Sequence, residues 1–125
     1  MAKESFEMIA SEIVGWCKDH ECWDNTAIYF NGKCWATWPS WAGETGEKIA
    51  EHVYEYANKD PRSYFEFANL ETLSMSFEGG LYTILNSYWE NEVRLKWFED
   101  FNDLFKRHGY YFEQGDAWNL SIYEN

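Results

Sequence analysis

Cysteine and histidine side chains near the start of the chain are the first candidates for chemistry. Cys17, His20 and Cys22 fall within six residues, and Cys34 is the remaining cysteine. Thiolate and imidazole groups both bind Zn²⁺, and the Cys-x-x-His-x-Cys spacing brings three of them into one turn region. Structural zinc modules usually carry paired arms, which this spacing does not match. We therefore interpret the cysteines as small buried side chains and His20 as a surface residue, with no metal or other cofactor.

Glutamates that recur at helical spacing form a second group. Glu47, Glu51 and Glu55 are four residues apart, and Glu44 lies one turn upstream. On a helix these carboxylates would repel one another, so the pattern favours binding over stability. Carboxylates about 6 Å apart approximate successive phosphates of a nucleic-acid strand. The stripe therefore predicts a surface that occupies a nucleic-acid-binding groove of another protein, and the structural alternative is a solvated helix face.

Tryptophans form a third group. Trp35, Trp38 and Trp41 fall within seven residues. Alternation along a strand places Trp35 and Trp38 on opposite sheet faces. Indoles are common anchors in protein interfaces and stack on sugar rings, whereas the structural alternative is that they cover the edges of a small core.

The residue types needed for catalysis are present without a matching motif. The histidines are His20, His52 and His108, and no Gly-x-Ser-x-Gly nucleophile motif accompanies them. Gly79-Gly80 lacks the lysine and the remaining pattern of a phosphate-binding loop. We therefore expect no catalytic residues and no enzymatic activity.

The elements that must position these groups are predicted from hydrophobic periodicity. Helices are expected over residues 4–18, 46–58, 81–88 and 92–108, the last capped by Gly109. Strands are expected over residues 26–30, 33–38, 64–67, 72–77, 110–113 and 118–123. Asn31-Gly32 supplies the two positive-φ positions of a type I′ turn, which predicts a β-hairpin around it. A second hairpin is expected to turn at Gly115-Asp116.

The order of these elements indicates the fold class. Hairpins outnumber long crossovers, which predicts an α+β fold with a mainly antiparallel sheet built from hairpins and helices packed on one face. At 125 residues, without an internal repeat or linker, the chain is expected to form a single α+β domain over residues 1–125. A hydrophobic fraction of 46% supplies enough apolar side chains for a packed core.

Charge restricts the possible partners. The chain has 22 acidic and 10 basic residues and a net charge of −12. Phosphates would meet like charge, which opposes direct binding to nucleic acid and favours a basic protein partner. No apolar run is long enough to cross a membrane, and the first residues lack the apolar core of a secretion signal. Together with an odd number of cysteines, these features predict a cytoplasmic protein with reduced thiols.

Charge, size and the glutamate stripe together predict a small acidic interaction protein. It would bind and block a basic surface of a nucleic-acid-binding or nuclease protein, as a nucleic-acid mimic. In size, single-domain organisation and negative charge, the chain is similar to the acidic anti-restriction and anti-CRISPR inhibitors of phages and mobile elements. The expected partner-binding residues are Glu44, Glu47, Glu51, Glu55, Trp35, Trp38 and Trp41.

Two other functions remain open at this point. One is a ligand- or carbohydrate-binding module that uses the tryptophan-rich hairpin, and the other is an enzyme of unrecognised type. Aromatic residues left on the surface would also permit self-association.

Overall fold

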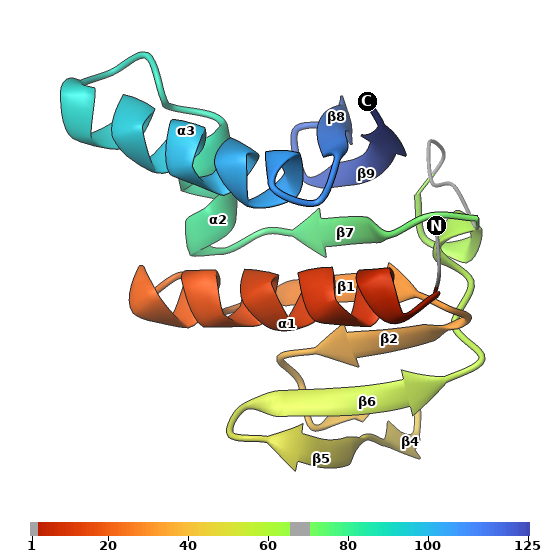
Figure 1. Ribbon diagram of the computed structural model, residues 1–125. Helices are drawn as coiled ribbons and strands as arrows, with labels where there is room; N and C mark the ends of the chain where they lie inside the picture. Colours follow the sequence, from red (N-terminus) through yellow and green to blue (C-terminus); the bar gives the residue numbers. More distant parts are fainter. Residues whose placement is uncertain (1–2, 66–70) are drawn as a thin grey trace.

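A seven-stranded antiparallel sheet forms the centre of the molecule (Figure 1). The computed structural model describes residues 3–65 and 71–125. In this part of the chain the strand order is β5-β6-β2-β1-β7-β9-β8, and β3 with β4 forms a small second sheet. The strands are β1 Thr26–Phe30, β2 Lys33–Ala36, β3 Ser40–Trp41, β4 Glu44–Thr45, β5 Glu47–Ala50, β6 Val53–Ala57, β7 Ser74–Phe77, β8 Tyr110–Asp116 and β9 Asn119–Glu124. The predicted α+β class with a mainly antiparallel sheet is confirmed.

Three α-helices and one short 3₁₀ turn complete the described elements. They are α1 Lys3–Asp19, α2 Gly80–Leu85, α3 Glu92–Lys106 and the 3₁₀ turn η1 Pro61–Ser63. The side chain of Asn91 caps α3 by accepting a hydrogen bond from the backbone N–H of Arg94 at 2.9 Å. At the other end Gly109 has a φ of 82°, and its N–H donates to the carbonyl of Lys106, as expected for a glycine that ends a helix.

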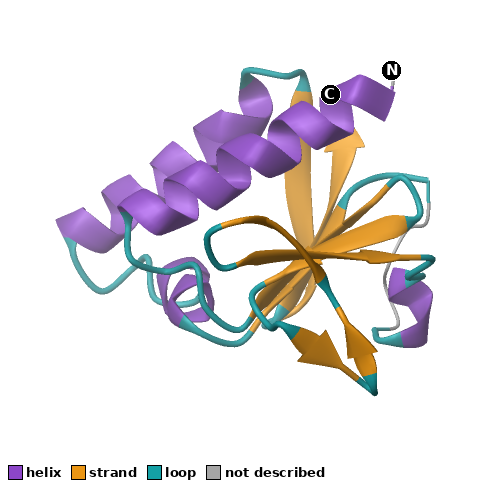
Figure 2. Cartoon of the chain, turned by 90° about the horizontal axis from the view of Figure 1, so that it is seen from below, coloured by secondary structure: helices purple, strands orange, loops and turns teal. Residues whose placement is uncertain are grey.

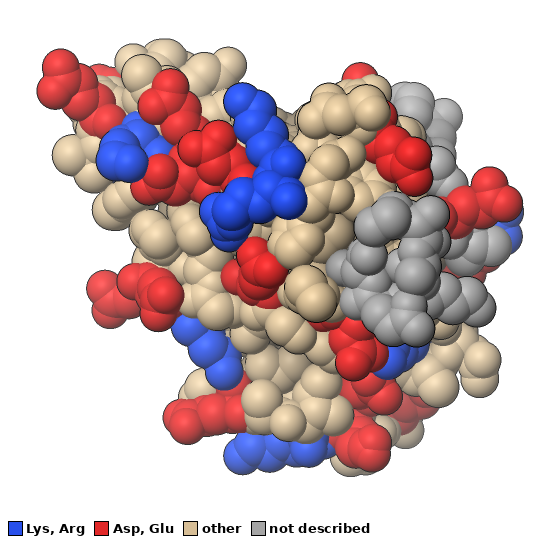
Figure 3. Space-filling view, viewed as in Figure 1, with Lys and Arg blue, Asp and Glu red and all other residues tan. Residues whose placement is uncertain are grey.

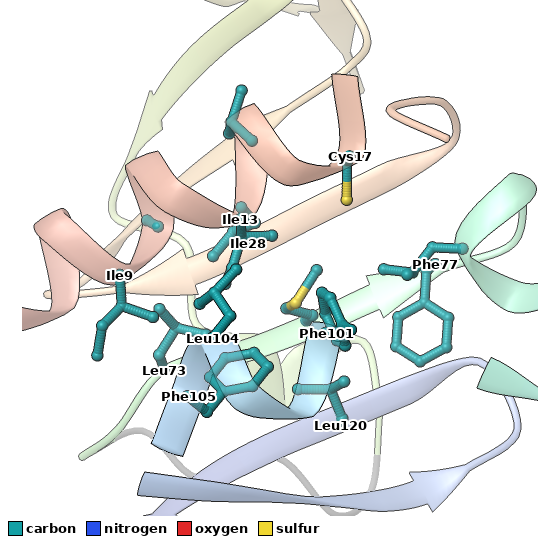
Figure 4. Close-up of a cluster of buried hydrophobic side chains, with 14 of the residues drawn as sticks. Ile9, Ile13, Cys17, Ile28, Leu73, Phe77, Phe101, Leu104, Phe105 and Leu120 are labelled. Atoms are coloured by element: carbon teal, nitrogen blue, oxygen red, sulfur yellow. The ribbon is translucent and has the colours of Figure 1, made fainter. Parts of the chain in front are cut away.

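The main core lies between the helices and one face of the sheet (Figure 4). Ile9, Ile13 and Cys17 recur at helical spacing on α1 and are fully buried. Phe101 and Phe105 of α3, with ring centroids 5.1 Å apart, belong to the same cluster. Because both helices contribute to one core, they cover the same face of the sheet, as Figures 1 and 2 show.

The opposite face of the sheet carries a second, aromatic cluster. Tyr29 of β1, Tyr56 of β6 and Phe65 are buried there, and Trp38 and Trp41 pack against them. The β3–β4 hairpin and η1 lie on this side, away from α1 and α3 (Figure 2). The sheet is therefore covered by helices on one face and by aromatic side chains from short segments on the other.

The hairpin around Asn31-Gly32 is confirmed. Asn31 and Gly32 have φ angles of 52° and 79°, as a type I′ turn requires. The register pairs Ile28 with Trp35 and Phe30 with Lys33. The second strand ends at Ala36, two residues earlier than predicted.

The helix predicted over residues 46–58 is wrong. This stretch forms the β5–β6 hairpin, whose turn contains Glu51 and His52, and His52 has a φ of 61°. Val53 and Tyr56 are buried, but Ile49 is 42% exposed, so the apolar residues of this stretch do not form one buried helical side. The segment from Val53 to Ala57 is rich in β-branched and aromatic residues, whose strand preference outweighed the helical spacing.

Other predicted boundaries also moved. The hairpin between β8 and β9 turns at residues 117–118 instead of Gly115-Asp116, with a register shift between Gln114 and Asp116. Of the strand predicted over 64–67, residues 64 and 65 are not in a strand, and residues 66 and 67 lie outside the described residues. Among the described helices, none is long and apolar enough to span a membrane.

Candidate functional site

The four glutamates of the predicted stripe do not share a helix face. Glu47 on β5 and Glu55 on β6 are direct partners in the antiparallel register. Glu44 belongs to β4 in the small second sheet, and Glu51 lies in the turn between β5 and β6. The helical spacing that would resemble successive phosphates is therefore absent, because a strand pair arranges these carboxylates differently.

Glu55 binds a buried indole on the α1 face of the sheet. Trp35, which is 8% exposed, donates from Nε1 to Oε1 of Glu55 at 2.8 Å. Lys33 Nζ lies 3.4 Å from the same carboxylate and 3.0 Å from Oε1 of Glu7 on α1. Burial alone would lower the pKa of Lys33, but the two carboxylates outweigh it and hold this pKa above its usual value. Trp35 and Glu55 thus join β2 to β6, and Lys33 links this pair to Glu7 of α1.

Trp38, Trp41 and Glu44 lie on the opposite face. The ring of Trp41 stands nearly perpendicular to those of Trp38 and Tyr56, at centroid distances of 5.5 and 5.4 Å. Glu44 is opposite Trp41 in the β3–β4 register and forms an ion pair with Lys59. Trp35 and Trp38 therefore belong to clusters on different faces, as alternation predicted. Both Trp38 and Trp41 are half-buried by neighbouring rings, which leaves little open indole surface for stacking on a sugar.

Glu51 lines a cleft between the end of α1 and the β5–β6 turn. The cleft has a volume of about 440 Å³, and its lining residues are Lys18, Glu21, Trp23, Glu51 and His52. Lys18 Nζ donates to the carbonyl of Glu51 at 2.7 Å, and Trp23 Nε1 donates to the carbonyl of His52 at 2.8 Å. Lys18 and Trp23 therefore hold the β5–β6 turn against the end of α1, which is a structural role for these two lining residues.

The cysteines and His20 do not come together as a metal site. Cys17 and Cys22 lie in the main core, whereas Cys34 is buried in the aromatic cluster of the other face. Hydrogen bonding with Cys22, together with burial, raises the pKa of the Cys17 thiol, and burial raises that of Cys34. His20 is half-buried instead of exposed, because it stacks on Trp16 at a centroid distance of 3.8 Å. Across residues 3–65 and 71–125, no three His, Cys, Asp or Glu side chains are placed to hold a metal ion.

The most exposed large aromatic residue is one that sequence reasoning missed. Within the described residues, Trp89 is 69% exposed and its chain neighbour Tyr88 is 38% exposed, while Leu95 of α3 is 42% exposed. Trp89 packs edge-on against Tyr88 at 5.4 Å, and Tyr88 packs against Phe98 of α3 at 4.3 Å. Leu95 lies one turn before Phe98 on the same side of the helix. We call Tyr88, Trp89 and Leu95 the Tyr88–Trp89 patch.

A sequence signal for this patch exists. The helix predicted over residues 81–88 ends at Leu85, which leaves Tyr88 and Trp89 in the polar segment that leads to Asn91, the residue that caps α3. Two aromatic residues in such a connection have no periodic partners that would bury them. Val93 in the first turn of α3 is also 58% exposed, because the buried residues of this helix lie in its second half.

The remaining histidines also have structural roles or open surroundings. His108 Nε2 lies 2.7 Å from Oε2 of Glu12, which Arg107 also contacts at 3.1 Å, so the end of α3 is tied to α1. His52 is exposed in the β5–β6 turn.

No protein-family model, curated protein or solved structure matches this chain. Its surface chemistry is therefore the basis for a functional proposal.

Proposed function

We propose that this chain is a small acidic interaction protein that binds a basic surface of another protein through the Tyr88–Trp89 patch. The observation that carries the proposal is the 69% exposure of Trp89 beside the exposed Tyr88. Single exposed apolar residues are ordinary, but Trp and Tyr together are the residue types that dominate binding free energy at protein interfaces.

The patch is held firmly although it lies in a connection. Tyr88 packs on Phe98, and Phe98 packs on Phe112 of β8 at 5.9 Å. Before the patch, Asn86 donates to the carbonyl of Ala117 at 2.7 Å, and Ser87 accepts a hydrogen bond from Arg94. A surface that is already ordered loses less conformational entropy on binding, which favours affinity. The connection runs along α3 to its outer end, away from the strands (Figure 1).

Charge suggests the kind of partner. The chain carries a net charge of −12, and Figure 3 shows acidic side chains, with basic ones among them, on the face that includes α3. Glu92 and Glu99 of α3 are exposed, and neither lies within ion-pair distance of a basic group among the described residues. A basic partner would be attracted by this field, which raises the association rate. Nucleic-acid-binding proteins present such surfaces, and occupying one would block access to nucleic acid.

The experiment combines capture with a measurement on purified components. Immobilised wild type, Trp89→Ser and the matched control Met8→Ser, which alters another exposed apolar side chain at 56%, are incubated with a lysate of the source cells. A protein retained by wild type and Met8→Ser but lost by Trp89→Ser is then purified. Its association is measured over a salt series, and its nucleic-acid binding is titrated with the chain.

The outcomes separate the apolar and charged contributions. We expect Trp89→Ser to increase the dissociation rate at every salt concentration, whereas Glu92→Gln with Glu99→Gln should lower the association rate and flatten its salt dependence. Glu113→Gln, a charge change on the exposed part of β8, serves as the control. The proposal would be refuted if the retained protein is acidic or if its association rate does not depend on salt. It would also be refuted if the partner still binds nucleic acid when it is saturated with this chain.

A further inference from the structure

The ammonium group of Lys59 is enclosed by aromatic rings on the sheet face away from α1. Its Nζ lies 4.6 Å from the ring centroid of Trp41 and 5.8 Å from that of Tyr56. Both distances fall within the range of cation–π attraction. Glu44 supplies a carboxylate that pairs with the same ammonium group. Only 10% of the Lys59 side chain is exposed, because the rings and the Glu44 carboxylate surround its stem and ammonium group.

Tyr64 borders this site through its contact with Trp41. Tyr64 packs against Trp41 at a centroid distance of 4.9 Å and stacks on Tyr29 at 5.9 Å. The hydrogen bond with Glu44 raises the pKa of Lys59, and the nearby Tyr64 hydroxyl raises it further. The ammonium group is therefore charged at neutral pH. The Glu44 side chain is 52% exposed, which means that the site opens toward solvent on its carboxylate side.

We propose that Trp41, Tyr56, Tyr64 and Glu44 form a binding site for an alkylammonium ion, such as a methylated amine, and that Lys59 is its intramolecular occupant. Aromatic rings around one carboxylate are the arrangement that recognises quaternary and methylated ammonium groups. The site lies on other elements than the Tyr88–Trp89 patch, so either proposal can fail without the other.

The side chain of Lys59 can leave without disturbing its backbone. The Lys59 N–H donates to the carbonyl of Gly32 at 3.1 Å, which fixes the main chain independently of the ammonium. Asn58, just before it, has a φ of 56° and turns the chain away from β6. Withdrawal of the flexible four-carbon stem would vacate the cage while the strand stays in place.

A purely structural ion pair makes a different prediction. If Lys59 only fastens the β3–β4 hairpin to β6, its removal weakens the fold and creates no preference for cations. If the rings and Glu44 form a binding site, Lys59 acts as a competing ligand, and its removal raises the affinity for an added ammonium ion. The two cases are separated by comparing a cation with a neutral molecule of the same shape.

The experiment titrates wild type, Lys59→Ala and Lys48→Ala with choline and with the uncharged isostere 3,3-dimethylbutan-1-ol. Lys48→Ala makes the same charge change on the exposed strand β5. Binding is followed by tryptophan fluorescence and by the NMR signals of the indole N–H groups. We expect saturable choline binding by Lys59→Ala, at least about tenfold weaker binding by wild type and Lys48→Ala, and no saturable response to the alcohol. Adding Glu44→Gln to Lys59→Ala should weaken choline binding.

A folded Lys59→Ala protein that does not bind choline, or that binds the alcohol equally well, would overturn the proposal. Should Lys59→Ala fail to fold, Lys59→Gln keeps part of the stem and is titrated in the same way. Recovery of folding by choline, but not by the alcohol, would also support the site. If neither variant folds and choline restores neither, the ammonium is only a structural element and the proposal is wrong.

Discussion

Glu47 on β5 and Glu55 on β6 face each other as cross-strand partners, yet they have unequal roles. The Glu55 carboxylate accepts a hydrogen bond from buried Trp35 and lies 3.4 Å from Lys33. Within the described residues, Glu47 is exposed and has no polar partner of this kind. Like charges placed opposite each other in a sheet are destabilising. Glu55 is thus kept in place by its partners, and Glu47 contributes only repulsion.

Substituting the two glutamates should therefore have opposite effects. Glu47→Lys replaces repulsion with attraction across the pair and should raise the free energy of unfolding by roughly 0.2–0.5 kcal/mol. Glu55→Ala leaves the Trp35 N–H without its acceptor and should lower it by about 1–3 kcal/mol. Urea denaturation of both variants provides the measurement. If Glu55→Ala raised the free energy of unfolding, as Glu47→Lys is expected to do, the Trp35–Glu55 contact would not stabilise the fold.

Glycine substitutions offer a second test with opposite signs. Gly32→Val places a β-branched residue at a φ of 79° and should destabilise the protein by about 1–2 kcal/mol. Gly15 lies within α1, and a Cβ atom added there meets nothing within 4 Å. Gly15→Ala should therefore stabilise by roughly 0.5–1 kcal/mol, because alanine favours the helix. The melting temperatures of both variants test these expectations. An unchanged melting temperature for Gly32→Val would contradict the turn geometry.

Stability should fall at alkaline pH. Burial raises the pKa of Tyr29 above its ordinary 10.0 and that of Cys34 above its ordinary 9.0. The folded state therefore keeps protons that the unfolded state releases, so their stabilising contribution is complete below about pH 9 and decreases as the pH rises further. Each group should contribute a slope of roughly 1.4 kcal/mol per pH unit. Denaturation between pH 7 and 11 measures this slope, and Cys34→Ala should reduce it; an identical slope in both proteins would contradict the assignment.

Purified protein should contain no stoichiometric zinc. Cys17 and Cys22 share the main core, but Cys34 is buried on the other side of the sheet, so these thiols cannot ligate one ion without unfolding. A structural zinc ion contributes folding free energy directly, and a chelator would then lower the melting temperature. Elemental analysis and a melt with EDTA test the expectation. One zinc per chain, with a chelator-dependent melt, would contradict it.

Local turn chemistry explains which parts of the fold could be predicted. Asn31-Gly32 carries its own backbone preference, so the β1–β2 hairpin follows from a few adjacent residues. The stretch from Glu47 to Ala57 carries two competing patterns. Its apolar residues match a helical period by coincidence, and the register shift between Lys48 and Ala50 interrupts the alternation that would have indicated a strand.

The candidate sites depend on contacts between distant segments. The Lys59 cage combines Trp41 and Glu44 from the β3–β4 hairpin with Tyr56 from β6 and Tyr64 from the segment after η1. Trp41 and Glu44 meet within one hairpin, but Tyr56, Lys59 and Tyr64 reach them only through the packing of the second sheet face. The extent to which Trp89 is exposed could not be predicted from the sequence either. It depends on where α3 begins relative to the strands.

The position of β9 determines when the sheet can be completed. This strand lies between β7 and β8, and its Ser121 hydroxyl forms a buried hydrogen bond with that of Ser74 at 2.7 Å. During synthesis β7 can pair with β1, but its other edge stays open until residues 119–124 have left the ribosome. Pairings between such distant residues form slowly, and an open apolar edge favours aggregation. The nascent chain therefore passes through a vulnerable interval, in which a chaperone would have most effect on its yield.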